Sequence, residues 1–107
     1  MHARRELQSL EMHRMIAARL VADPDAVLAK AFAHLDSWLE RQAGTATEAV
    51  LVEWRNLLQT LSVPEIAAFL CSEGERAIRM RQSSPFGGIL SPQEVWITKK
   101  HDATARA

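Results

Sequence analysis

Three arginines and the connection that follows them are the part of the sequence best suited to bind a charged group. Arg76 and Arg79 lie three residues apart and share one face of a helix, so both guanidinium groups can reach one anion or one acidic surface. Residues 83–92 supply serine hydroxyls, two prolines and a Gly-Gly pair that allows close backbone approach. The candidate partner-binding residues are Arg76, Arg79, Arg81, Gln82, Ser83, Ser84, Pro85 and Phe86.

A purely structural role for this segment stays open. Phe86, Ile89 and Leu90 can fold under a helical bundle as a plug, with the Gly-Gly pair making the turn. In that case the arginines pair with nearby carboxylates, and the candidates are Glu73, Glu75 and Glu94. A phosphate-binding loop of the nucleotide-hydrolase type is excluded, because no Gly-Lys-Ser/Thr follows the glycines.

The remaining polar residues do not form a recognisable catalytic or metal-binding group. His13 and His34 lie on different helices, and neither has a second ligand three or four residues away. Cys71 sits in an apolar helix, which is typical of a buried, unreactive thiol. The acidic pairs Asp23/Asp25 and Glu73/Glu75 occur at helix starts, where negative charge stabilises free backbone N–H groups. The sequence therefore predicts a binding protein without enzymatic activity, metal or cofactor.

The candidate residues are positioned by helices with clear apolar spacing. A three-to-four-residue repeat that begins at Leu7 predicts a helix over residues 4–22, and a second follows over 24–42. Asp23-Pro24 separates the two helices. A third helix is predicted over 46–61, and shorter helices are predicted to begin at Ser62, Ser72 and Ser91. The tryptophans fall on apolar helix faces, so core packing is the default expectation for Trp38, Trp54 and Trp96. A position of one of them at a partner interface stays open, because tryptophan is favoured there.

A repeated capping pattern marks the helix starts. A hydroxyl and an acidic residue three positions later satisfy each other's backbone N–H groups. The pattern occurs at Thr45/Glu48, Ser62/Glu65, Ser72/Glu75 and Ser91/Glu94. Gly44 is expected to end the second helix in a left-handed conformation. Residues 95–98 have the β-branched composition of a strand, but they follow a cap, so a helix is preferred.

The fold expected from these elements is all-α. It is a small bundle of about five to six helices, with an N-terminal helical hairpin and a Pro/Gly-containing loop near the C-terminus. Residues 1–100 are expected to form a single helical domain, and residues 101–107 a frayed tail.

Composition narrows the function classes. The 107 residues contain 13 basic and 13 acidic side chains. The sequence has no apolar run long enough to span a membrane and no apolar stretch typical of a secretory signal. The lone Cys71 favours a reducing cytoplasm. Residues 44–75 carry a net charge of −4 and residues 76–107 a net charge of +4, which fits either internal attraction or a charged partner.

Four segments carry a resemblance to a known group of proteins. They are residues 9–14 (SLEMHR), Asp23-Pro24, residues 53–58 (EWRNLL) and residues 79–92 (RMRQSSPFGGILSP). Over residues 7–97 the chain is similar to small bacterial proteins that are typically encoded beside a toxin-like enzyme, such as a nucleotidyltransferase or a zeta-type kinase. These proteins are taken to be the antitoxin or chaperone half of the pair.

The resemblance implies an antitoxin or chaperone-like protein that neutralises a cognate toxin enzyme by covering its active site. In that mechanism the arginines pair with carboxylates of the enzyme, and Phe86 fills an apolar hollow on it. The alternative is a DNA-binding transcriptional regulator, including one that regulates its own operon. The zero net charge makes direct DNA binding secondary, because phosphate contacts require a basic face.

Overall fold

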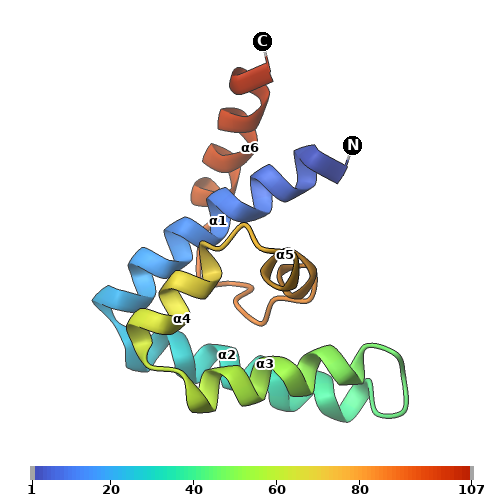
Figure 1. The fold of residues 1–107 in the computed structure, drawn as a ribbon. Coiled ribbons are helices and arrows are strands. Elements are labelled where there is room, and N and C mark those ends of the chain that lie inside the picture. The colour runs from blue at the N-terminus through green and yellow to red at the C-terminus, as the bar shows by residue number, and fades with distance from the viewer. Residues whose placement is uncertain (1, 107) are drawn as a thin grey trace.

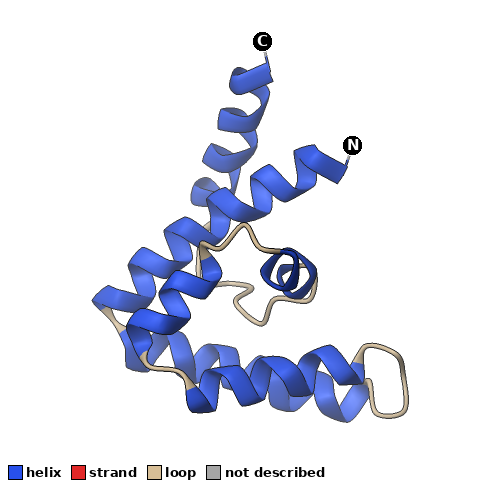
Figure 2. Cartoon of the chain, viewed as in Figure 1, coloured by secondary structure: helices blue, strands red, loops and turns tan. Residues whose placement is uncertain are grey.

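The computed structural model describes the backbone of residues 2–106 and the side chains of residues 5–99. Within these residues the chain forms six α-helices and no strand, which confirms the predicted all-α bundle (Figure 2). The helices are α1 (His2–Ala22), α2 (Pro24–Arg41), α3 (Glu48–Thr60), α4 (Val63–Leu70), α5 (Glu75–Arg81) and α6 (Pro92–Arg106).

The helices form two layers and a projecting arm. α2 and α3 run side by side in opposite directions, while α1 packs mainly along α4 (Figure 1). Asp23 alone joins α1 to α2 in the expected N-terminal helical pair. The short α5 lies between the layers, and α6 contacts α1 and extends away from α2 and α3 (Figure 1). The loop between α5 and α6 therefore crosses the interior side of the bundle.

Trp54 of α3 is the centre of the core and is fully buried, as predicted. Phe69 and Phe86 meet its ring nearly at right angles, with ring centroids 5.7 and 5.8 Å away. The indole Nε1–H donates to the Met80 carbonyl at 2.8 Å, so the buried polar atom is satisfied. Trp54 thus ties α3 to α4, α5 and the loop. The surrounding apolar core includes Ile16, Leu20, Val27, Leu35, Leu51, Ile66 and Leu70.

The breaks around α2 use the residues that the sequence indicated. Asp23 is the N-cap, and its side chain accepts a hydrogen bond from the Ala26 N–H at 3.4 Å. Pro24 occupies the first turn, where the missing N–H would have no helical partner. After the helix ends, Gly44 takes a φ of +80°, the left-handed conformation predicted for it.

Two of the four predicted capping boxes form. Ser62 Oγ accepts from the Glu65 N–H at 3.3 Å, and the Glu65 carboxylate accepts from the Ser62 N–H at 2.9 Å. Ser91 and Glu94 make the same reciprocal pair at 3.1 and 2.9 Å. These caps fix the starts of α4 and α6.

The other two predicted capping boxes are wrong. Thr45 Oγ1 donates to the Gln42 carbonyl at 2.6 Å and closes the turn after α2, so α3 begins only at Glu48. Ser72 Oγ accepts from the Gly74 N–H at 3.1 Å, and Gly74 is the N-cap of α5. Both hydroxyls bond the nearby backbone of a turn, which is the alternative that Ser and Thr offer to a helix cap.

α6 extends the helical part of the chain past the boundary predicted at residue 100. Residues 95–98 are helical, as preferred over a strand. The helix continues to Arg106, through most of the segment assigned to a frayed tail, and Ala107 lies outside the described residues. Within residues 2–106, no helix combines the length and apolarity needed to cross a membrane.

Candidate functional site

The eight predicted binding residues do not form one exposed surface. Three of them are buried, namely Arg81, Pro85 and Phe86. Ser83 and Ser84 are half-buried, and the remaining three, Arg76, Arg79 and Gln82, are exposed. The segment divides into an outer pair of arginines, a buried arginine and a loop, and each part has different partners.

The outer pair, Arg76 and Arg79, binds one carboxylate of the same chain. Arg76 Nε and Arg79 Nη2 donate to Glu53 Oε2 at 2.8 and 3.0 Å. The hydrogen bond from Arg79, followed by that from Arg76, lowers the pKa of Glu53 below its ordinary value. Arg76 also lies over the ring of Phe69, 5.6 Å from its centroid. The partner is thus Glu53 on α3, rather than the three glutamates considered from the sequence, and it cancels one of the two positive charges.

Arg81 is enclosed and holds the end of α4. Its Nη1 donates to the carbonyls of Leu70 and Ser72 at 3.3 and 2.6 Å. Carbonyls at a helix C-terminus have no helical partner, so a guanidinium there satisfies them. Burial lowers the pKa of Arg81. The side chain is therefore a structural element of the bundle, with part of its hydrogen-bonding capacity already committed.

The loop after α5 acts as the plug that the sequence left open as an alternative. Phe86 is 2% exposed and lies against Trp54, inside the protein's own core. The side chains of α2 hold the loop backbone: His34 Nδ1 donates to the Pro85 carbonyl at 2.9 Å, and Lys30 Nζ donates to the Gly88 carbonyl at 3.1 Å. Phe86 consequently presents almost no surface to another molecule.

A chain of hydrogen bonds fastens the same loop to α1. His13 Nδ1 is 2.7 Å from the Ser9 carbonyl, which can only accept, so Nδ1 carries the proton. Nε2 then accepts from Ser84 Oγ at 2.8 Å, and Ser84 Oγ accepts in turn from the Phe86 N–H at 3.3 Å. The neutral imidazole is thus both donor and acceptor between α1 and the loop.

Burial of His13 has an electrostatic consequence. The imidazole is almost fully enclosed, and this desolvation lowers its pKa from 6.5 to about 4. The bond to the Ser9 carbonyl opposes the shift, and the positive charge of Arg81 adds to it. His13 therefore stays neutral near pH 7, the form that the hydrogen-bond chain requires.

α6 exposes two large apolar side chains that its packing does not use. Trp96 is 62% exposed and Ile97 is 55% exposed, so the core position predicted for Trp96 is wrong. Thr98 is buried instead and accepts a hydrogen bond from Gln8 of α1 at 3.5 Å. Because successive helical residues point about 100° apart, a helix that turns Thr98 toward α1 turns Trp96 and Ile97 toward solvent. Trp38 is half-buried and stacks on His34, with ring centroids 5.4 Å apart.

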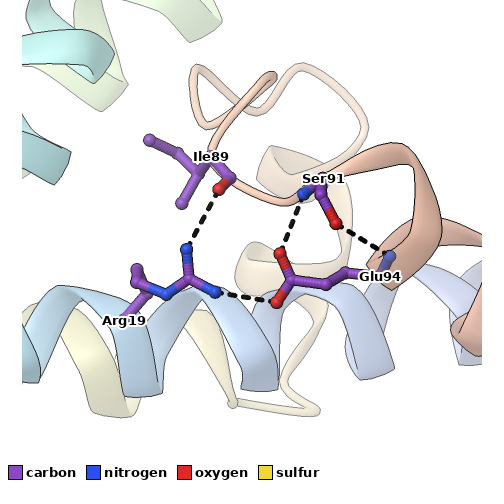
Figure 3. A network of polar contacts seen from close by, with 4 residues as sticks. All are labelled: Arg19, Ile89, Ser91 and Glu94. Carbon is purple, nitrogen blue, oxygen red and sulfur yellow. Dashed lines mark hydrogen bonds and ion pairs between the residues drawn. The ribbon is translucent and has the colours of Figure 1, made fainter.

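The base of α6 is fixed to α1 by polar contacts. Arg19 donates to Glu94 Oε2 at 2.7 Å and to the Ile89 carbonyl at 3.5 Å, while Glu94 Oε1 accepts from the Ser91 N–H (Figure 3). The hydrogen bond from the Ser91 backbone, more than the charge of Arg19, lowers the pKa of Glu94. Trp96 therefore projects from a helix whose first turn has a defined position.

An open groove of about 760 Å³ lies beside Trp96. Apolar side chains of the loop and of α6 form its walls, and charged side chains of α1 and α6 stand at its rim. The walls include Ile89, Leu90, Pro92, Val95 and Trp96, and the rim includes Arg19, Glu94 and Lys99.

Other candidate chemistry is sparse. The side chains of residues 5–99 include no group of three His, Cys, Asp or Glu that could hold a metal ion. Cys71 is half-buried, so it is more accessible than the sequence suggested. Its position at the end of α4 brings no titratable partner into hydrogen-bond contact among the described residues.

Sequence reasoning missed the residues that hold the segment in place. A polar His13 within the apolar series of the first helix was the available signal, but its partner Ser84 is 71 positions away. Nothing in the spacing of Glu53 pointed to the arginines. A scan against protein-family models, a search of curated proteins and a search of solved structures each found no match for this chain.

Proposed function

We propose that the chain is an interaction protein that neutralises a partner enzyme by covering part of its surface, as the resemblance to antitoxin and chaperone proteins implies. The observation that carries the proposal is the outward position of Trp96, with Ile97 beside it, on an arm that extends from the bundle (Figure 1). We place this activity in the cytoplasm, in keeping with the lone cysteine.

Exposed tryptophan is costly to leave in water and valuable in an interface. Complete burial of a large aromatic side chain removes about 150–250 Å² from solvent. Tryptophan is also enriched among the few residues that dominate binding energy. Val95 packs against the core and Thr98 bonds Gln8 of α1, so folding alone gives no reason for Trp96 at its position.

The groove next to Trp96 extends the proposed contact surface. Its apolar walls suit a side chain or helix of the partner, while Arg19 and Lys99 at the rim suit acidic residues around it. A typical interface buries about 800 Å² on each side. α6, the groove and the adjoining part of α1 can supply such an area.

The burial of Phe86 changes how occlusion would work. The resemblance implied that the loop reaches into the enzyme, but Phe86, Pro85 and Arg81 are enclosed in this chain. We therefore assign the loop to supporting the base of α6, and assign the enzyme contact to the arm itself. Direct DNA binding has less support, because Glu53 already neutralises part of the charge of Arg76 and Arg79.

The proposal is tested by binding to the product of the adjacent gene. The tagged chain is co-expressed with that product, and its affinity and the rescue of growth are measured. Trp96→Ala should weaken binding by about 30-fold or more and reduce rescue, as expected for a central aromatic anchor.

Val52→Ala is the matched control, because Val52 is also an exposed apolar residue but lies on α3. It should change the affinity by less than about threefold. Absence of any complex with the neighbouring product, or equal effects of the two substitutions, contradicts the proposal.

A further inference from the structure

A cleft between α1 and α5 contains a guanidinium that is only partly satisfied. Two adjoining hollows of about 440 and 320 Å³ share four lining residues: Arg5, Ser9, Arg81 and Gln82. Both volumes fall within the range of small-ligand sites, about 300–1,000 Å³. The cleft lies apart from the groove at Trp96, with which it shares none of its lining residues.

Arg81 lines both hollows of this cleft, and backbone contacts hold its side chain. It is 6% exposed, and its Nη1 is committed to the carbonyls of Leu70 and Ser72. Its Nε and Nη2 make no hydrogen bond with the described residues, and neither is fully enclosed among them. These two atoms form one edge of the planar guanidinium, and they remain accessible from the cleft.

The free edge of Arg81 has the geometry that a carboxylate or phosphate requires. Nε and Nη2 present two parallel N–H donors, which bind two oxygens of one oxyanion. A buried cation without an adjacent anion is unfavourable, so a bound anion stabilises it. Glu6 lines the larger hollow, and the charges of Glu6 and Glu73 act favourably on Arg81, yet no carboxylate of the described residues is close enough to make an ion pair with it.

Further donors surround the same space. Arg5 on α1 adds a second positive charge, and the polar residues Ser9 and Gln82 line both hollows. The smaller hollow also borders Ser84 and His13, whose imidazole is neutral. The cleft therefore combines two guanidinium groups with neutral hydrogen-bond donors.

We propose that this cleft binds a small oxyanion, a carboxylate or a phosphate, on the Nε/Nη2 edge of Arg81, with Arg5 as the second cation. The proposal does not depend on the proposed function, because the cleft and the exposed arm are separate surfaces. Its test uses the free chain without any partner.

The test is an NMR titration that follows the arginine Nε–H signals. Inorganic phosphate and acetate are added separately, and sodium chloride at matched ionic strength serves as the reference. The Arg81 signal should move in a saturable way with at least one of the two anions, with a Kd on the order of millimolar. The anion with the lower Kd identifies whether the site prefers a tetrahedral or a planar group.

Variants of two exposed arginines distinguish binding in the cleft from non-specific attraction of anions to positive charge. Arg5→Gln should weaken binding at least about fivefold, whereas Arg41→Gln, at an exposed position on α2 outside the cleft, should change it less than about twofold. Equal losses for the two variants, or an Arg81 signal that moves no more with phosphate or acetate than with chloride, overturn the proposal. Trp96→Ala should leave the titration unchanged, so failure here is distinguishable from failure of the proposed function.

Discussion

The histidine at position 13 shows how one buried side chain can define a loop. It donates from Nδ1 to its own helix and accepts at Nε2 from Ser84, so only the neutral form with the proton on Nδ1 fits both partners. Protonation would turn Nε2 into a second donor, although this atom must accept the hydrogen bond from Ser84 inside an enclosed site. The loop is therefore fixed at neutral pH by an imidazole that resists charging.

The lowered pKa of His13 predicts a loss of stability in mild acid. In the unfolded chain His13 binds a proton near pH 6.5, whereas in the folded chain it does so only near pH 4. The stability contributed by neutral His13 is therefore complete above pH 6.5 and falls as the pH drops toward 4. The free energy of unfolding should fall by roughly 1.4 kcal/mol per pH unit within that window. Urea unfolding at a series of pH values measures it.

His13→Gln provides the comparison, because glutamine keeps a polar group but does not titrate. The variant should be less stable at neutral pH and should show a flatter profile between about pH 6.5 and 5. Parallel profiles for the two proteins would falsify the assignment of the acid sensitivity to His13.

The helices differ in what stabilises their first turn. α4 has 8 residues and α6 begins beside the groove, and both start with a complete capping box. The N-cap of α3, Thr47, makes no side-chain cap bond, and the burial of Trp54 and Leu57 stabilises this helix instead. Helices with a buried face tolerate a missing cap, and the seven-residue α5 is a second case, because its N-cap Gly74 makes no side-chain bond while Ala77 and Met80 are buried.

Removal of a side chain that caps a helix by a hydrogen bond should therefore lower the free energy of unfolding more than removal of a side chain that occupies the N-cap position without such a bond. Ser62→Ala should lower the free energy of unfolding by about 1 kcal/mol, because the Glu65 N–H loses its acceptor. Thr47→Ala should change it by less than about 0.5 kcal/mol, because Thr47 makes no side-chain cap bond. Denaturant unfolding of the two variants decides, and similar losses would contradict this account of the helix starts.

Across the whole molecule, the loop after α5 connects the core to the arm. Its apolar residues enter the centre of the bundle beside Trp54, and its end carries the Ser91 cap and the Arg19–Glu94 contact (Figure 3). The opposite net charges of residues 44–75 and 76–107 are partly used inside the fold, since Glu53 pairs with Arg76 and Arg79. Internal attraction thus accounts for part of the charge asymmetry.

Truncation of the plug should affect stability far more than truncation of the arm. Phe86→Ala opens a cavity next to Trp54 and should lower the free energy of unfolding by about 3–5 kcal/mol. Trp96→Ala removes an exposed side chain and should change it by less than about 0.5 kcal/mol. Thermal and denaturant unfolding measure both, and a large loss for Trp96→Ala would mean that the arm packs on the bundle.

The candidate site was predictable only as a segment. The local composition of residues 76–92 indicated arginines, hydroxyls and a glycine turn, and it left both a binding role and a plug open. The choice between them depends on distant residues: Glu53 for the outer arginines, the end of α4 for Arg81, and Trp54 for Phe86. Such partners cannot be inferred from spacing, because contact between them requires the bundle to be assembled.

Local sequence is enough to predict the helical class, the break at Asp23-Pro24, the left-handed Gly44 and the capping boxes at Ser62 and Ser91. These features follow from backbone dihedrals, apolar periodicity and hydrogen bonds within a few residues. Only the tertiary structure decided that Phe86 is enclosed while Trp96 is exposed. Both are aromatic residues with apolar neighbours in the chain, and their environments differ because burial is set by which helix packs against which.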